Sequence, residues 1–133
     1  MGNILVDANI FLEVFLEQEK SEQCKKILRE IEAGKSAFLS TFTIDAIIII
    51  MGNYKVKPSK IELFINSLFN YDGLQIYSVT LKDRLEALKF MAKYGFDYEN
   101  SITLQSAISC ECDGLVSLDK HFDKVKEVKR IEP

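Results

Sequence analysis

Several residue types on which common protein classes depend are scarce in this chain of 133 residues. The chain has only two prolines and six glycines, which argues against a loop-rich or collagen-like protein. No apolar run reaches the ~18 residues that a membrane-spanning helix needs. The first residues carry neither a basic segment nor a signal-type apolar stretch. We therefore expect a cytoplasmic protein without a membrane segment.

Histidine and cysteine are scarce as well. His121 is the only histidine and the cysteines are Cys24, Cys110 and Cys112, whereas zinc sites draw on several such ligands. An odd number of cysteines without a secretion signal favours free thiols. No G-x-S-x-G motif is present, which argues against a Ser-His-Asp hydrolase. A catalytic Cys–His pair stays as an alternative.

The remaining composition is that of an ordinary globular protein. Hydrophobic residues make up 47% and charged residues 28% of the chain, and a length of 133 residues predicts one domain over residues 1–133. The formal net charge is −3, whereas proteins that only coat nucleic acid are usually basic. Action on nucleic acid would therefore require something that offsets the carboxylates, such as a divalent cation.

Short apolar runs alternate with segments of helical periodicity along the whole chain. Because the runs are continuously apolar, they indicate strands buried on both faces of a parallel sheet. This predicts an α/β sandwich with a mostly parallel sheet of four to five strands. The expected strands are residues 4–6, 37–39, 74–77, 115–118 and a short one within 125–131. The expected helices are residues 8–16, 21–33, 43–51, 58–68, 80–94 and 99–110.

The segment 43–51 is the least clear of these predictions. It contains four consecutive isoleucines at 47–50, which by propensity favour a strand. A helix ending at Gly52 is nevertheless expected, because Ser40 or Thr41 can cap it and a strand would follow the previous one too closely. A helix that is apolar on all sides must be buried in the core or against a partner.

Acidic residues follow several of the predicted strands. In a parallel sheet, the carboxyl ends of strands meet at one edge, where sites form. Converging carboxylates repel one another unless a cation lies between them, and hard oxygen ligands suit Mg²⁺ or Mn²⁺. Such an ion supports hydrolysis of a phosphodiester. The candidate residues are Asp7, Asp45, Asp97, Asn100 and Asp119.

Each of these residues also has a purely structural interpretation. Asp7 could cap the first helix, Asp119 could belong to a turn, and Asp45 could complement a helix dipole. Their order and spacing are more specific than any one of them.

The chain resembles PIN-domain proteins, and among them the toxin ribonucleases of the VapBC type. The resemblance spans essentially the full length and rests on VDAN at 6–9, STFTID at 40–45 and LVSLDKHFD at 115–123. It implies a three-layer α/β/α sandwich and an endoribonuclease that depends on Mg²⁺ or Mn²⁺. It also implies Asp7, Asp45 and Asp119 as metal ligands, with Ser117 hydrogen-bonded inside the site.

Two positions depart from the family pattern. The family usually has Glu where Asp45 stands, and Asp where Asn100 stands. Asn100 can offer a carbonyl oxygen but no charge, and Asp97 is expected to compensate from the same side of the helix. His121 stands where a further acid is common; it is interpreted as an exposed turn residue, with phosphate contact or proton donation as alternatives.

Two other functions remain open on these residues. With Asn100 in place of an acid, the chain could be a PIN-like module that binds a protein or RNA partner without cleavage. A phosphatase of the haloacid-dehalogenase type is disfavoured, because that family requires Asp-x-Asp and this chain has Asp7 and Asn9.

The number of large apolar residues predicts assembly. The helix at 43–51, the aromatic pair Phe11 and Phe15, and a further set of Phe64, Leu68 and Phe69 exceed what a small interior needs. We expect a homodimer and a groove for a partner segment. The resemblance points to an antitoxin as that partner.

Overall fold

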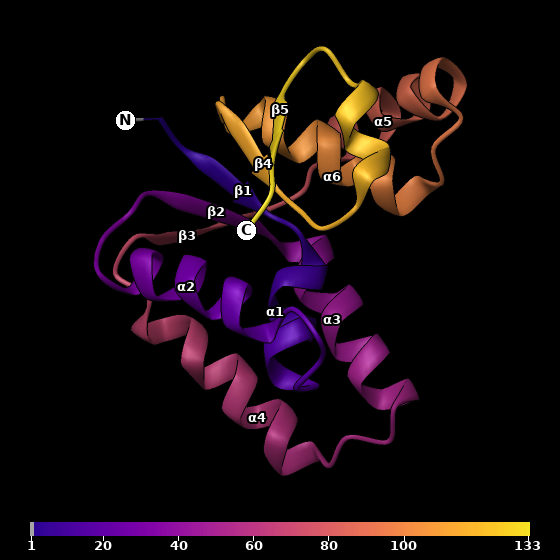
Figure 1. Ribbon diagram of the computed structural model, residues 1–133. Coiled ribbons are helices and arrows are strands. Elements are labelled where there is room, and N and C mark those ends of the chain that lie inside the picture. Colours follow the sequence, from indigo (N-terminus) through magenta and orange to yellow (C-terminus); the bar gives the residue numbers. More distant parts are fainter. Residues whose placement is uncertain (1) are drawn as a thin grey trace.

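Five parallel strands form a single sheet in the computed structural model, which describes residues 2–133 (Figure 1). The strand order is β3-β2-β1-β4-β5, and every neighbouring pair is parallel. The predicted α/β class is confirmed, and the five strands match the upper end of the expected number. The strands are β1 (Ile4–Val6), β2 (Ala37–Ser40), β3 (Leu74–Tyr77), β4 (Gly114–Val116) and β5 (Lys129–Ile131).

Helices cover both faces of the sheet and complete the predicted three layers. In Figure 1, α1 to α4 lie on one face, and α5 and α6 lie on the other. The helices are α1 (Ala8–Phe15), α2 (Ser21–Glu32), α3 (Thr41–Asn53), α4 (Pro58–Ser67), α5 (Leu81–Tyr94) and α6 (Tyr98–Ser109). Two short 3-10 turns, η1 (Leu68–Asn70) and η2 (Lys120–Lys124), precede β3 and β5.

The buried strand β1 divides the core into two parts. Successive side chains of a strand point to opposite faces of the sheet. Ile4 and Val6 therefore pack with the helices α1 to α4, whereas Leu5 packs with α6 and η2. All three residues are at most 4% exposed, so β1 is held from both sides at the centre of the molecule.

Short polar residues fix where the helices begin. The side chains of Asp7, Ser40, Thr80 and Asp97 accept backbone N–H groups at the starts of α1, α3, α5 and α6. Of the two cap residues considered for α3, Ser40 is the one used, through a 3.0 Å bond from Thr43 N. Three of these capped helices directly follow a strand, so their starts lie at the carboxyl edge of the sheet.

The segment with four isoleucines is a helix, as expected, but it is not buried all round. Ile47 and Met51 are fully buried, whereas Ile49 is 64% exposed. A helix that packs on one face of a sheet covers only one stripe of its side chains. The core therefore buries one face of the helix, and burial of the opposite face against a partner stays a prediction.

Another part of the predicted apolar excess lies inside the core. Phe11 is 1% exposed and packs edge-to-face on Phe64 and Tyr71, with ring centroids 5.7 and 6.1 Å away. The prediction that Phe11 adds to an external patch was wrong, because α4 covers it. The three cysteines are free thiols, as expected. Within residues 2–133, no helix combines the length and the apolar character needed to cross a membrane.

The order of the strands reverses at the centre of the sheet. From β1 the chain proceeds to β2 and β3 on one side, and only later adds β4 and β5 on the other. The connections that leave β1 and β4 therefore run to different parts of the molecule. Such a switch point opens a crevice at the carboxyl ends of two neighbouring strands, which is where sites form in open parallel sheets.

Candidate active site

Asp7 lies at this switch point, directly after β1. It is only 6% exposed, and its Oδ1 accepts the backbone N–H of Ala8 at 2.8 Å, which caps α1. Burial raises the pKa of Asp7 from 3.8 to about 6. Hydrogen bonds from Ser117 and Ala8 oppose that rise, while the negative charges of Glu99 and Asp119 add to it. Hydrogen bonds therefore hold the Asp7 carboxylate in place, although burial and the neighbouring negative charges oppose its ionisation.

A polar network joins the ends of β1 and β4 across a sequence separation of 110 residues. Ser117 Oγ donates to Asp7 Oδ2 at 2.7 Å, and Asn9 Nδ2 donates to both Asp7 Oδ2 and Ser117 Oγ, at 3.3 and 3.1 Å. Asn9 Oδ1 in turn accepts the backbone N–H of Leu118. The expected hydrogen-bonding role of Ser117 is confirmed, and Asn9 is an additional member of the network.

Asp119 forms the next part of the site. Its backbone N–H donates to Ser117 Oγ at 3.0 Å, so one hydroxyl links it to Asp7. Its Oδ2 accepts Asn100 Nδ2 at 3.2 Å, and its Oδ1 lies 2.8 Å from His121 Nδ1. The amide nitrogen of Asn100 is thus the donor to Asp119, and the expectation that its carbonyl oxygen serves as a ligand stays a prediction.

Glu99 is an acidic residue that the sequence interpretation missed. It lies in the first turn of α6, one residue before Asn100, and its charge is among those that raise the pKa of Asp7. Desolvation of its carboxyl group, followed by the charges of Asp97 and Asp119, raises the pKa of Glu99 itself. Its position beside Asn100 in the acidic start of a helix was the available signal.

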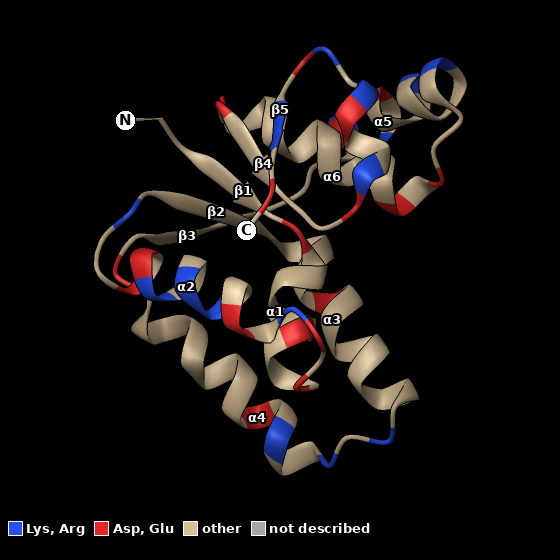
Figure 2. Cartoon of the chain, in the orientation of Figure 1, with Lys and Arg blue, Asp and Glu red and all other residues tan. Residues whose placement is uncertain are grey.

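The other two candidates lie further out. Asp97 is the N-cap of α6, where its Oδ1 accepts Asn100 N at 2.8 Å. Asp45 is exposed on α3 and makes no hydrogen bond or ion pair within residues 2–133. Figure 2 shows acidic segments at the end of β1 and at the starts of α3 and α6. The structure thus brings Asp7, Glu99, Asn100 and Asp119 together, while Asp45 and Asp97 lie at the margin.

The donor set of this site suits a hard divalent cation. Asp7, Glu99 and Asp119 offer carboxylate oxygens and Asn100 an amide, and no lysine or arginine side chain of residues 2–133 forms an ion pair with these acids. However, no three His, Cys, Asp or Glu side chains of residues 2–133 are already arranged as a metal cluster.

Comparison with protein families matches residues 4–128 to the PIN domain. The chain belongs to the PIN domain family. Comparison with curated protein sequences finds no match. The fold of this PIN domain is shared by several solved structures, although all identities are low.

Three of these structures illustrate the likeness. A toxin–antitoxin complex from Klebsiella pneumoniae has a TM-score of 0.71 and 16% identity, covering 94% of each chain. The sarcin–ricin-loop-cleaving toxin VapC20 of Mycobacterium tuberculosis has a TM-score of 0.76 and 9% identity, covering 94% of this chain and 98% of that one. DNA-bound VapBC from Salmonella typhimurium has a TM-score of 0.75 and 11% identity, covering 99% and 98%. The VapC-like PIN fold expected from the sequence motifs is thereby confirmed.

Proposed function

We propose that this PIN domain is an endoribonuclease dependent on Mg²⁺ or Mn²⁺, and that it is the toxin of a toxin–antitoxin pair. The observation that carries the proposal is Asp7, a buried carboxylate at the strand switch point whose pKa is raised to about 6. Burial keeps water from screening the charge of Asp7, and the negative charges of Glu99 and Asp119 repel that charge. A bound divalent cation would relieve that cost, and phosphodiester hydrolysis is chemistry that such an ion supports.

In this proposal Asp7 and Asp119 are the principal ligands, with Glu99 and Asn100 around them and Asp45 and Asp97 at the margin. A divalent ion held there would supply an activated water and stabilise charge on the leaving oxygen. The protein's own contribution is orientation. Ser117 holds Asp7 and the backbone of Asp119 with one hydroxyl, and Asn9 holds that hydroxyl. Both acids are thus fixed relative to each other before any ligand arrives.

RNA is the proposed substrate on two grounds. The VapC20 toxin that shares the fold is described as cleaving the sarcin–ricin loop. The switch-point site of this chain is also open at Asp119 and His121, the latter with a side chain 74% exposed, so that a polymer can reach the acids.

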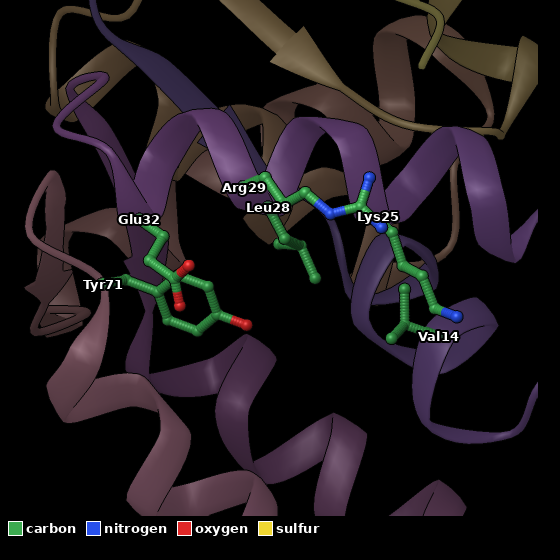
Figure 3. A pocket seen from close by; sticks show the side chains of 6 residues that line it. All are labelled: Val14, Lys25, Leu28, Arg29, Glu32 and Tyr71. Atoms are coloured by element: carbon green, nitrogen blue, oxygen red, sulfur yellow. The ribbon is translucent and has the colours of Figure 1, made fainter.

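An antitoxin is the proposed protein partner, since structures that share the fold are toxin–antitoxin complexes. The face formed by α3, α4 and η1 leaves large apolar side chains exposed, led by Phe69 at 84%. Beside it, a hollow of about 160 Å³ has an apolar floor of Val14, Leu28 and Tyr71 and a charged rim (Figure 3). An apolar floor with a charged rim suits an amphipathic partner segment.

A test of the partner proposal isolates a protein that is captured with this chain from its source cells, and titrates it calorimetrically against the chain. Phe69→Asp should weaken binding at least tenfold, whereas Lys126→Asp, an exposed change in the loop between η2 and β5, should leave it within twofold. Equal effects of the two changes would remove the assignment of this face.

We propose a homodimer through α5 rather than through α3. Leu81, Leu85 and Leu88 are exposed and recur at helical spacing along one side of α5. A stripe of this kind on a charged helix favours burial against a second copy. Light scattering at micromolar concentration should give twice the chain mass, and Leu85→Glu should reduce it to one chain. A single-chain mass for the unmodified protein would contradict the dimer.

The decisive experiment for the enzyme is cleavage of a mixed RNA pool with Mn²⁺, Mg²⁺ or EDTA. The unmodified protein, Asp7→Asn and the control Asp72→Asn are compared; Asp72 is an exposed residue before β3, at the opposite edge of the sheet. Cleavage should need metal, disappear in Asp7→Asn and persist in Asp72→Asn. Cleavage that persists in EDTA would overturn the proposal.

One alternative has an observation in its favour. Asn100 stands where the family usually has an acid, and it already donates to Asp119. A site closed in this way would bind RNA or a protein without cutting. In the same experiment, that function predicts RNA binding with no cleavage under any metal.

A further inference from the structure

A second hollow adjoins the acid site on the side away from Asp7. Its volume is about 390 Å³, within the range of small-ligand sites. It is lined by Gly95, Phe96, Asp97, Asn100, His121 and Lys124. Asn100 and His121 belong to both places, because each also contacts Asp119, at 3.2 and 2.8 Å. A group bound in the hollow would therefore lie directly beside whatever the acids hold.

Lys124 provides a fixed positive charge in this hollow. Its ammonium donates to the carbonyl oxygen of Tyr94 at 2.9 Å and stands 5.1 Å from the centre of the Phe96 ring. The carbonyl uses only one of the three N–H donors. Two donors remain for an anionic oxygen, and the side chain is already ordered. This is the position of a phosphate contact.

His121 provides an unpaired ring nitrogen at the same place. Its Nδ1 faces Asp119 Oδ1 at 2.8 Å, while its Nε2 makes no hydrogen bond within residues 2–133. A ribose 2′-hydroxyl, which RNA has and DNA lacks, can both donate and accept a hydrogen bond. An exposed ring nitrogen next to a phosphate contact is suited to recognising that hydroxyl.

We propose that this hollow binds the nucleotide next to the scissile phosphate, with Lys124 on its phosphate and His121 Nε2 on its ribose 2′-hydroxyl. The proposal rests on the proposed ribonuclease function and assigns to it a subsite that selects RNA over DNA. Lys124 and His121 are binding residues here, distinct from the acids that would hold an ion. Neither residue is needed for the hydrogen-bond network around Asp7.

The test measures binding rather than cleavage. A labelled single-stranded RNA 12-mer and its DNA counterpart are titrated by fluorescence anisotropy in EDTA, with the Asp7→Asn change present in every protein to prevent cutting. Lys124→Met keeps the aliphatic stem over Phe96, and Lys124→Arg restores a charge. Lys60→Met is the matched control, because Lys60 is an exposed lysine on α4, far from η2 in Figure 1.

Lys124→Met should weaken both RNA and DNA about fivefold and reduce the salt dependence of binding by about one phosphate contact. Lys124→Arg should recover most of the loss, and Lys60→Met should stay within twofold. His121→Ala should weaken RNA about fivefold and leave DNA unchanged. Thermal melting of each variant separates these effects from unfolding.

Three results would overturn the assignment. These are equal losses in Lys124→Met and Lys60→Met, equal losses of RNA and DNA in His121→Ala, and an absence of measurable RNA binding. Cleavage by the unmodified protein with Mn²⁺ is recorded separately. If that protein cleaves RNA while Lys124→Met binds normally, only the subsite is wrong. If the binding pattern holds but nothing is cleaved, only the nuclease proposal is wrong.

Discussion

Two aspartates of this protein are equally buried and yet differ in their chemistry. Asp7 is 6% exposed and Asp83 is 5% exposed. Burial opposes ionisation at both, but the pKa of Asp7 is raised to about 6 whereas that of Asp83 is lowered below 3.8. The difference lies in what surrounds each carboxylate.

Asp83 is surrounded by donors. Although burial alone would raise its pKa, three hydrogen bonds to its carboxylate outweigh that effect. Ser109 Oγ and Tyr77 Oη donate at 2.6 Å each, and Thr80 N donates at 2.9 Å as part of a capping box. This acid ties the end of β3 to the start of α5 and the end of α6. The Asp83 carboxylate therefore has a structural role, because its hydrogen bonds join three elements of the fold.

Asp7 also accepts hydrogen bonds, from Ala8, Asn9 and Ser117. Its other neighbours are the acids Glu99 and Asp119, which raise its pKa further. The donors therefore fix the orientation of the Asp7 carboxylate, but none of them carries a positive charge that would neutralise it. Burial is the largest contribution to the raised pKa of Asp7, and its acidic neighbours add to it, whereas hydrogen bonds outweigh burial at Asp83. This balance distinguishes a carboxylate poised for a ligand from one with a structural role.

The largest expected contrast between the two acids is in activity. Asp7→Asn should reduce metal-dependent RNA cleavage at least 100-fold, because it removes the central charge of the site. Asp83→Asn should keep cleavage within threefold, since Asp83 lies beyond β3 at the edge of the sheet. Initial rates on one RNA at saturating Mn²⁺ measure both. Comparable losses in the two variants would mean that Asp7 acts only through folding.

The free energy of unfolding should be reduced by Asp83→Asn and not by Asp7→Asn, the reverse of the order expected for cleavage. Asp83→Asn should lower the free energy of unfolding by about 2 kcal/mol at pH 7, because hydroxyl donors of Ser109 and Tyr77 lose an ionised acceptor. The folded pKa of Asp83 lies below the unfolded value, so its stabilisation is present above pH 3.8 and is lost as the pH falls through the folded pKa. Urea unfolding of both proteins measures the difference in the free energy of unfolding, which should be smaller at pH 3 than at pH 7.

Adding a charge to the crowded site should strengthen cation binding. Asn100→Asp should raise Mn²⁺ affinity about tenfold, which is the ~1.4 kcal/mol left after desolvation offsets part of the Coulomb attraction. Calorimetric titration of both proteins measures it. Asn66→Asp, which adds the same charge on α4, is the control and should leave Mn²⁺ affinity unchanged. Equal or weaker affinity in Asn100→Asp would place residue 100 outside the site.

The smallest expected effect is a gain in stability from Asp7→Asn. A folded pKa raised from 3.8 to about 6 means that Asp7 lowers stability progressively as the pH rises through that window, and by a constant amount above it. We expect Asp7→Asn to raise the free energy of unfolding by about 1 kcal/mol at pH 7.5 and by nothing at pH 3.5. Asparagine keeps the cap of α1. A loss of stability at pH 7.5 would show that the lost bond from Ser117 outweighs the removed charge.

The helix–strand pattern was readable from the sequence because it depends on local chemistry. Continuous apolar runs, caps such as Ser40 and Thr80, and the glycine at 95 marked the elements close to where they lie. Even the isoleucine run at 47–50 was correctly assigned to a helix. Which of its residues are exposed was not predicted, because local periodicity does not say which side of a helix another element covers.

The sequence predicted most of the acidic residues of the site but not how they are arranged in space. Their positions after strands placed Asp7 and Asp119 at one edge, and the β1–β4 pairing joined them. Glu99 was missed, because its importance arises only from its proximity to Asp7 and Asp119 in space. The bond from the amide nitrogen of Asn100 to Asp119 could not be predicted either, because it depends on how the start of α6 lies beside the end of β4.

The sequence by itself determined the alternation of strands and helices, the caps, and the presence of acids after β1 and β4, since each depends on residues close together in the chain. Only the tertiary structure decided which acids share one space. The pKa of Asp7, the bond between Asn100 and Asp119, and the hollow bounded by His121 and Lys124 all depend on neighbours distant in sequence. Burial and charge act through space, so they exist only once the five strands are in order.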